Sequence, residues 1–234
     1  SSAASDVYKR QEEDMRYSMC FFPLVGIVIG LLSWCWWLFC QQFGIGKMCF
    51  AFVGLAIILL VTGGIHMDGY MDTMDALHSY GSREKKLEIL KDSHIGAFAV
   101  IMTVLYVLIT AGAYSEIKNY SVMASFCGSY FLSRIFSAIA VVSFPCAKKE
   151  GTLYMFADAA QEKIVKRSLY AELAFCALWQ ILMDPKAGIM QLICALAVFG
   201  YYYYKSKKEF GGITGDLAGY FVTPVSYTHL TLPT

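Results

Sequence analysis

Six apolar stretches, most of them long enough to cross a lipid bilayer, constrain this chain more than any other feature. They lie near residues 19–39, 48–65, 97–115, 121–144, 169–184 and 187–204, and a seventh begins near residue 213. A helix needs about 20 mostly apolar residues to cross the hydrocarbon core. We therefore expect an all-α, polytopic integral membrane protein with about six complete transmembrane helices and a truncated seventh.

The two ends of the chain do not share this pattern. Residues 1–11 and 224–234 follow no neighbouring periodicity and resemble translated sequencing-adapter sequence. We predict that both ends are non-native. On this interpretation, residues 12–223 form one integral membrane domain that is truncated at both ends.

The distribution of Lys and Arg predicts the orientation in the membrane, because cytoplasmic loops are enriched in these residues. Loops on one predicted side of the membrane are rich in Lys and Arg, whereas the loops on the other side hold only Lys47, Lys118 and Lys186. We expect the N-terminus and the basic loops to face the cytoplasm, and the net charge of +1 gives no reason to expect a nucleic-acid partner. The basic loops and the segment after the sixth stretch carry Arg83, Lys85, Lys86, Lys91, Lys148, Lys149, Lys163, Lys166, Arg167, Lys205, Lys207 and Lys208.

Three aspartates follow the second apolar stretch, in GGIHMDGYMDTMDALHSYG. Asp68, Asp72 and Asp75 have i, i+4, i+7 spacing, which places them within about 60° on one helical face. Like charges at this spacing repel, and no Lys or Arg lies between Lys47 and Arg83. A divalent cation would remove the conflict, and oxygen ligands favour Mg²⁺, with Mn²⁺ as the alternative. The other interpretation is an acidic interfacial helix without a metal.

The polar stretch that contains these aspartates predicts a cytoplasmic acidic helical hairpin. We place its break at residues 80–82, with Ser82 as the N-cap of the second short helix. Asp92 lies where the chain re-enters the membrane, which makes it a catalytic candidate or a further metal ligand. We predict that Asp72 and His66 are catalytic together with Asp92. His66 and His94 flank the segment, and for each histidine a purely structural role stays open.

The motif GGIHMD (63–68) recurs as GGITGD (211–216), and both read G-G-I-x-x-D. Glycine permits close backbone approach and unusual dihedral angles. Two such corners would bring Asp68 and Asp216 to a shared site. An aspartate entering a membrane span is costly and usually functional. We therefore predict that Asp216 is a metal ligand and that the motif glycines contact substrate; these are Gly63, Gly64 and Gly212.

Two basic residues complete the candidate site. Arg134 lies within the fourth apolar stretch, where a charged residue is functional by default, although a shorter helix would let it reach the interface. Its planar fork suits a carboxylate or a phosphate. Lys148 begins the next basic loop, where it would attract an anionic substrate or only set the topology. These residues together predict a site for a divalent metal and a phosphorylated substrate, with phosphoryl transfer from a diphosphate to an alcohol as the simplest reaction.

Three motifs resemble those of the cobalamin synthase family, the adenosylcobinamide-GDP ribazoletransferases. They are TGGIHMDGYMDTMDAL, REKKLEILKDSHIGAFAV and GGITGD, with weaker similarity in FFPLVGIVIG and FPCAKKEGTLYMFA. The resemblance covers almost all of residues 15–222. It implies a multi-pass enzyme of the bacterial or archaeal cytoplasmic (inner) membrane with its active site on the cytoplasmic side. It also implies that the enzyme joins adenosylcobinamide-GDP to α-ribazole or its 5′-phosphate, gives adenosylcobalamin or its 5′-phosphate and GMP, and requires Mg²⁺.

The resemblance also suggests roles for single residues. It implies metal ligands at Asp68, Asp72 and Asp75, completed by Asp216, with Asp92 as a further ligand or base. The chain departs from the family at Ala76, where glycine is usual. It departs again near its end, because the family continues after TGD into a further helix with an acidic residue, whereas this chain turns into TPVSYTHLTLPT from residue 223. Other corrinoid-assembly enzymes or a second copy of the chain are possible partners besides the substrates and the lipid bilayer.

Two other functions stay open at this point. A CDP-alcohol type phosphotransferase also uses spaced aspartates and Mg²⁺, but its D-G-x-x-A-R pattern is missing, since Asp68-Gly69 is followed by Tyr70, Met71 and Asp72. An ion-coupled transporter would place acidic residues near the middle of the membrane. We expect the aspartates at the cytoplasmic edge, which favours an enzyme.

Overall fold

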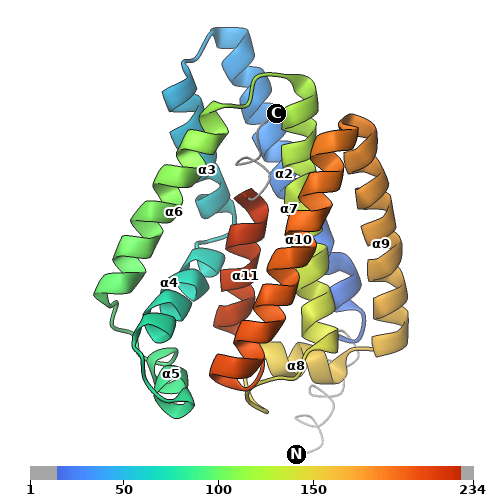
Figure 1. Cartoon of the computed structure of the whole chain (residues 1–234). Helices are drawn as coiled ribbons and strands as arrows, with labels where there is room; N and C mark the ends of the chain where they lie inside the picture. The colour runs from blue at the N-terminus through green and yellow to red at the C-terminus, as the bar shows by residue number, and fades with distance from the viewer. Residues whose placement is uncertain (1–14, 228–234) are drawn as a thin grey trace, which may run out of the picture.

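The computed structural model describes residues 15–227, and side chains up to Thr223, as an all-helical protein (Figure 1). Apart from one isolated bridge between Cys146 and Ile213, these residues form no β-structure. The elements are α2 (Ser18–Phe43), α3 (Lys47–Val61), α4 (Ile65–His78), α5 (Arg83–Ile89), α6 (Ala97–Ser115), α7 (Tyr120–Ser143), α8 (Thr152–Ala159), α9 (Glu162–Met183), α10 (Pro185–Lys205), η1 (Ser206–Phe210) and α11 (Gly215–Tyr227).

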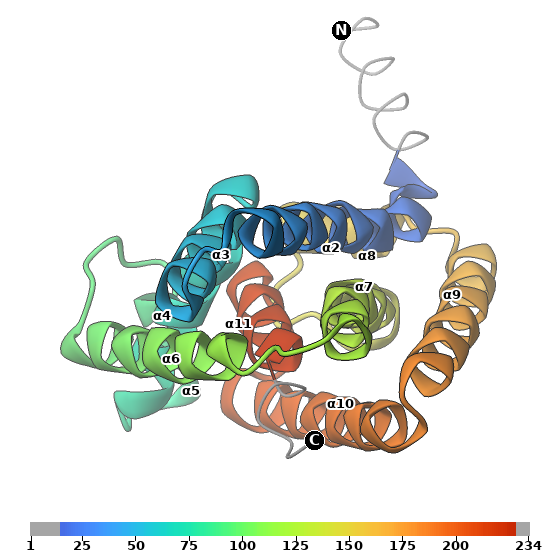
Figure 2. The same cartoon turned by 90° about the horizontal axis from the view of Figure 1, so that it is seen from above.

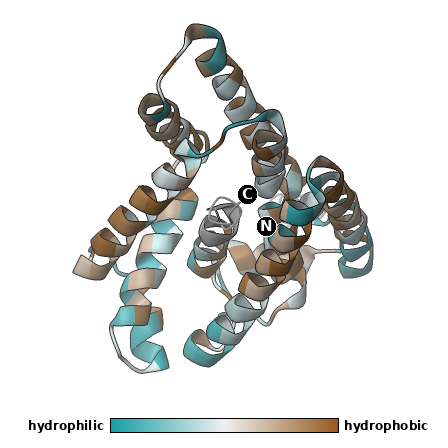
Figure 3. Cartoon of the chain, turned by 45° about the horizontal axis from the view of Figure 1, so that its top comes forward, coloured by the Kyte–Doolittle hydropathy of each residue, from teal (hydrophilic) through white to brown (hydrophobic). Residues whose placement is uncertain are grey.

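The long apolar helices confirm the predicted class of membrane protein. Within the described residues, four helices are long and apolar enough to cross a bilayer: α2, α6, α7, and α10 with its continuation through η1. The bent pair α3 and α4 makes a fifth if it counts as one span. Helix α9 fills the predicted fifth span but begins earlier, at Glu162, and includes several charged residues. Hydrophilic residues gather at α5 and in the loops, while the middle parts of the long helices are hydrophobic (Figure 3).

Helix α7 is the centre of the bundle, with α2, α9, α10 and α11 around it (Figure 2). Close packing against α2 depends on two glycines. A Cβ added to Gly26 would overlap the carbonyl of Tyr130, and one at Gly30 would lie 2.9 Å from the carbonyl oxygen of Cys127. Small residues let membrane helices approach to backbone contact, where packing replaces the hydrophobic effect as the driving force.

A buried polar cluster ties α9 and α10 to α7. The Oγ of Ser125 lies 2.6 Å from Oε1 of Gln180 and 3.1 Å from Oε1 of Gln191, and Nε2 of Gln180 donates to the Ser125 carbonyl at 3.1 Å. These three side chains are buried. Hydrogen bonds between membrane helices contribute about 0.6 kcal/mol each on average, so the cluster specifies which helices pack together more than it stabilises them.

A glycine corner divides α3 from α4. Gly63 and Gly64 both have left-handed backbones, with φ of 60° and 75°, and the two helices meet at a bend of 93°. A side chain at either position would be strained, which explains the G-G pair. The predicted span over residues 48–65 therefore ends at Val61, not at residue 65.

The packing of α4 against α6 is a feature that the sequence did not predict. Tyr70 donates from its hydroxyl to the Met102 carbonyl at 3.4 Å and packs against Tyr106, so α4 runs along the first half of α6. Its start lies beside the middle of α6, and about 10 Å of helix separates Asp68 from Asp75 along the axis. The acidic helix is therefore the second half of a bent pair that packs along a membrane helix, rather than a segment lying wholly beyond the boundary.

The predicted division of the polar stretch into two short helices is confirmed. Helix α4 ends at His78, and Tyr80 takes a left-handed conformation with φ of 53°. The Ser82 side chain accepts a hydrogen bond from the Lys85 amide at 3.4 Å and caps α5. Ala76, where the resemblance led us to expect glycine, is fully buried inside α4.

Candidate active site

The two G-G-I-x-x-D motifs meet where α4 crosses α11. A Cβ added to Gly69 would lie 2.6 Å from the carbonyl oxygen of Asp216 and 3.0 Å from its Cα. On the other helix, a Cβ at Gly219 would lie 3.3 Å from the Cα of His66. The helices touch here through their backbones because neither glycine carries a side chain. This crossing sets Asp216 beside the turn of α4 that holds Asp68 and Asp72.

The carboxylates at this crossing act on one another electrostatically. The Asp72 carboxylate experiences the charges of Asp68, Asp216 and Asp75, and the Asp216 carboxylate experiences that of Asp68. No ion pair of these four aspartates occurs among the described residues. Lys148 is the basic group whose charge acts on Asp216. The crossing therefore gathers negative charge that no direct salt bridge neutralises.

These carboxylates fit a cation that the protein holds through few ligands. Among the described residues, no three His, Cys, Asp or Glu side chains converge closely enough to hold one ion. Mg²⁺ keeps several waters and usually binds through one or two carboxylates together with substrate phosphates. An oxygen-only set at a close helix crossing suits that mode of binding, and it does not suit an all-protein cage.

Asp75 has structural partners that the sequence did not reveal. Its carboxylate accepts hydrogen bonds from the amides of Gly96, at 2.5 Å, and Ala99, at 2.8 Å. Gly96 is the N-cap residue of α6, and the first amides of a helix have no partner within it. Asp75 therefore caps α6 from a neighbouring helix. Its i+7 spacing from Asp68 indicated a metal ligand and could not reveal this contact across 21 residues.

Removing this cap should weaken the protein. We expect Asp75→Ala to lower stability by about 0.5–2 kcal/mol, the usual effect of losing an N-capping side chain. Asp75→Asn keeps one carbonyl acceptor and should lie closer to wild type. Thermal unfolding of the purified variants in one detergent measures both. An Asp75→Ala variant with an unchanged unfolding temperature would show that the cap does not stabilise α6.

His66 and Arg134 lie together, on a different face of α4 from the aspartates. Both line a small cavity between the glycine corner, α6, α7 and α11, together with Thr62 and Thr223. Arg134 is 2% exposed; its Nη1 donates to the Ser133 hydroxyl at 2.9 Å, and its charge acts on His66. Since His66 and Asp68 are two residues apart, they point about 160° from each other around the helix. The structure thus places both predicted residues near the site but not on its acidic face.

Asp92 lies in the exposed loop after α5. Its Oδ1 accepts a hydrogen bond from the His94 amide at 3.0 Å and lies 2.6 Å from Nδ1 of the His94 ring. The hydrogen bond from the His94 side chain is the main cause that lowers the pKa of the Asp92 carboxyl, which makes it a weaker base. Among the described residues, the charges that act on Asp72 do not include that of Asp92.

The loop that carries Lys148 is fastened to the second motif. The Ile213 amide donates to the Pro145 carbonyl at 2.8 Å, and the Ala147 amide donates to the Ile213 carbonyl at 2.9 Å. A Cβ at Gly212 would overlap this loop's backbone. Gly212 therefore permits a close approach, whereas Gly63 and Gly64 form a corner. Burial and the charge of Lys91 lower the pKa of Lys148, which stays near Asp216 in the same arrangement.

Comparisons with known proteins show the family to which the chain is similar. The family model for cobalamin-5-phosphate synthase matches residues 5–232. An adenosylcobinamide-GDP ribazoletransferase from Lachnoclostridium phytofermentans is 40% identical over 214 residues, which cover 91% of this chain and 81% of that protein. A protein of the same name from Desulfitobacterium hafniense is 33% identical over 218 residues, with 88% and 82% covered. One from Clostridium perfringens is 29% identical over 231 residues, with 96% and 90% covered. No solved structure gives a significant match.

Proposed function

This chain belongs to the cobalamin-5-phosphate synthase family, and we propose that the crossing of α4 and α11 carries out the family's reaction. The chain is a membrane transferase of the last step in cobalamin nucleotide loop assembly. Its substrates are adenosylcobinamide-GDP and α-ribazole or α-ribazole 5′-phosphate. The observation that supports this site best is the close approach of Gly69, the residue after the first G-G-I-x-x-D motif, to Asp216, the last residue of the second.

The reaction forms one bond and breaks one. The hydroxyl oxygen of α-ribazole attacks the phosphorus linked to cobinamide. The bond from that phosphorus to the bridging oxygen of the diphosphate breaks, and GMP leaves with the electron pair. The hydroxyl proton passes to a carboxylate or to solvent. The products are adenosylcobalamin, or its 5′-phosphate, and GMP.

We place Mg²⁺, with Mn²⁺ as the alternative, beside Asp68, Asp72 and Asp216, where one or two of these carboxylates would bind it together with waters and the substrate diphosphate. Bound there, the ion would neutralise charge on the diphosphate and on the leaving group. Asp75 belongs to the same face, but its oxygens already hold the start of α6, so we assign it a positioning role. Lys148 adds positive charge beside Asp216 and would attract an anionic substrate.

Of the three predicted catalytic residues, Asp72 supports the proposal best. It lies among the other carboxylates, whereas Asp92 is held by His94 in an exposed loop and His66 faces Arg134 in the cavity. Arg134, Gly63 and Gly64 lie around the corner at which α4 begins, so their contact with substrate would be at the deep end of the site. We propose that the site faces the cytoplasm, because the basic loops lie at the same end of the bundle as α5.

The location of the aspartates does not distinguish a ribazoletransferase from a transporter, but family membership does. Because α4 packs along α6, which is a candidate membrane span, the location of its acidic face does not by itself distinguish an enzyme from a transporter with ion sites near the middle of the membrane. The match over nearly the whole chain favours a ribazoletransferase over a transporter or a CDP-alcohol phosphotransferase.

The test supplies purified protein in nanodiscs with adenosylcobinamide-GDP and α-ribazole, with and without Mg²⁺. We expect GMP and adenosylcobalamin in equal amounts, and only when both protein and metal are present. Chromatography of the reaction mixture measures both products. If a folded protein gives no product with any divalent metal, the proposed site is wrong.

A further inference from the structure

The segment that leads into Asp216 begins with a π-helical turn. Helix α10 passes directly into η1, a π-helix over Ser206–Phe210, and Gly211 follows with a left-handed φ of 84°. Single π-helical turns are rare and occur often at functional sites. The motif GGITGD starts directly after this turn. The conformation of η1 therefore determines the direction in which the chain continues toward Asp216.

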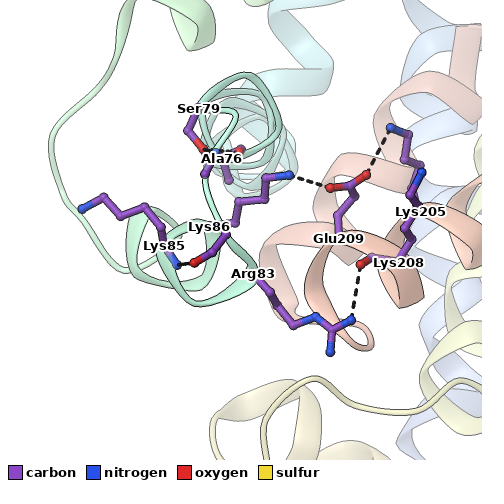
Figure 4. A network of polar contacts seen from close by, with 10 residues as sticks. Ala76, Ser79, Arg83, Lys85, Lys86, Lys205, Lys208 and Glu209 are labelled. Atoms are coloured by element: carbon purple, nitrogen blue, oxygen red, sulfur yellow. Dashed lines mark hydrogen bonds and ion pairs between the residues drawn. The ribbon is translucent and has the colours of Figure 1, made fainter.

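A mostly buried ion pair fastens η1 to α5, the helix that follows α4. Nζ of Lys86 lies 2.5 Å from Oε2 of Glu209, and the side chains are 10% and 18% exposed (Figure 4). Lys205 lies 3.7 Å from the other oxygen of Glu209. Arg83 adds a hydrogen bond from Nη2 to the Lys208 carbonyl at 3.4 Å. Lys86 and Arg83 of α5 therefore both contact η1, and Glu209 is the residue that Lys86 and Lys205 share.

Lys86 is more buried than a lysine whose only role is to orient the protein in the membrane. Its neighbour Lys85 pairs with Glu88 on the same helix at 3.0 Å, and those side chains are 58% and 70% exposed. An exposed pair of this kind has little influence on structure. Lys86 instead gives up most of its contact with water to reach a carboxylate 123 residues away.

The pair joins the two parts that meet at the active site. Asp68 and Asp72 belong to α4, which continues through a short turn into α5 and Lys86. Asp216 follows Glu209 through the segment that is also fastened to the loop of Pro145 and Ala147. The segments that carry Asp68 and Asp216 are therefore joined at two places, at the crossing of α4 with α11 and at the ion pair between α5 and η1.

We propose that Lys86 and Glu209 are positioning residues that fix Asp216 relative to Asp68 and Asp72 and so set the affinity for the divalent cation. The proposal rests on the proposed function, since it takes the metal ligands from among these three carboxylates. Neither residue touches substrate. Both act through the path of the chain into α11.

The experiment measures Mn²⁺ binding to the full chain in nanodiscs by electron paramagnetic resonance, for Lys86→Met, Glu209→Gln and the double variant. Loss of a residue that orients metal ligands typically weakens binding by about 10- to 100-fold, and we expect a change of this size in each single variant. The double variant should be no weaker than either single one, because both remove the same contact. Lys86→Arg keeps the charge and should bind nearly as wild type does.

Lys85→Met is the matched control, because it removes a lysine and an ion pair from the adjacent position of α5. It should bind Mn²⁺ as wild type does. Hydrogen exchange of the amides in residues 211–216 gives a second measurement that needs no metal. We expect faster exchange there in Lys86→Met and Glu209→Gln, and no change in Lys85→Met.

The outcomes separate the two proposals. Wild type that binds no Mn²⁺ would overturn the metal site and the positioning role together. Wild type that binds, with unchanged affinity in Glu209→Gln and Lys86→Met, would overturn the positioning role and leave the proposed function intact. If Lys86→Met does not fold, the affinity of Glu209→Gln for Mn²⁺ decides in the same way.

Discussion

Asp72→Asn is expected to abolish Mg²⁺-dependent turnover while the protein still folds. Asparagine has nearly the same shape, so the packing of α4 against α11 should persist. It removes one negative charge from the residue on which Asp68, Asp216 and Asp75 all act. A metal ion supplies several kcal/mol of transition-state stabilisation, and a loss of about 4 kcal/mol corresponds to roughly 10³-fold in rate.

The measurement is the rate of GMP release over a range of Mg²⁺ concentrations, beside thermal unfolding of the same preparation. Glu116→Gln is the matched control, because it neutralises a carboxylate just beyond the opposite end of α6. This control should retain full activity. Wild-type rates for Asp72→Asn would show that the acidic face of α4 does not hold the catalytic metal.

Much of the fold was predictable, because apolar length and glycine position are both local properties of the sequence. The stretch over residues 97–115 matches α6, and the one over 121–144 matches α7 almost residue for residue. The break near residues 80–82 and the cap at Ser82 follow from residue types that favour turns and helix starts. The packing of α4 along α6 was not predictable. The hydrophobic stretch that ends at Val61 does not reveal that the next helix turns back along α6.

The candidate site was predictable in part. The repeated G-G-I-x-x-D motif predicted that Asp68 and Asp216 share a site. In the structure the Asp216 backbone packs against Gly69, the residue after Asp68, and the charge of Asp68 acts on Asp216. Asp75 was assigned as a metal ligand from its spacing, and Arg134 was assigned to the site from its place within an apolar stretch. Neither property reveals which partner the side chain contacts. Asp75 caps a helix 21 residues away, and Arg134 faces His66. The contact between Lys86 and Glu209 spans 123 residues, and its sequence signal is only one basic residue among several.

Gly69→Ala is expected to inactivate the protein with little loss of structure. The added methyl group would lie 2.6 Å from the Asp216 carbonyl oxygen and 3.0 Å from its Cα, and both are backbone atoms that cannot rotate away. The two helices must separate, at a typical cost of about 1–3 kcal/mol for overpacking. Part of this cost is offset, because alanine favours a helix over glycine by about 1 kcal/mol. Stability should therefore fall only modestly.

Activity should fall much further, because separation of the helices moves Asp216 away from Asp68 and Asp72. A displacement of about 1 Å in a catalytic arrangement can cost on the order of 10²-fold in rate. Gly112→Ala in α6 and Gly200→Ala in α10 are matched controls, since nothing lies within 4 Å of a Cβ at either position. Both should keep wild-type rates and equal or greater stability. A fully active Gly69→Ala would mean that catalysis does not require the contact between α4 and α11, and the carboxylates would then have to act without Asp216.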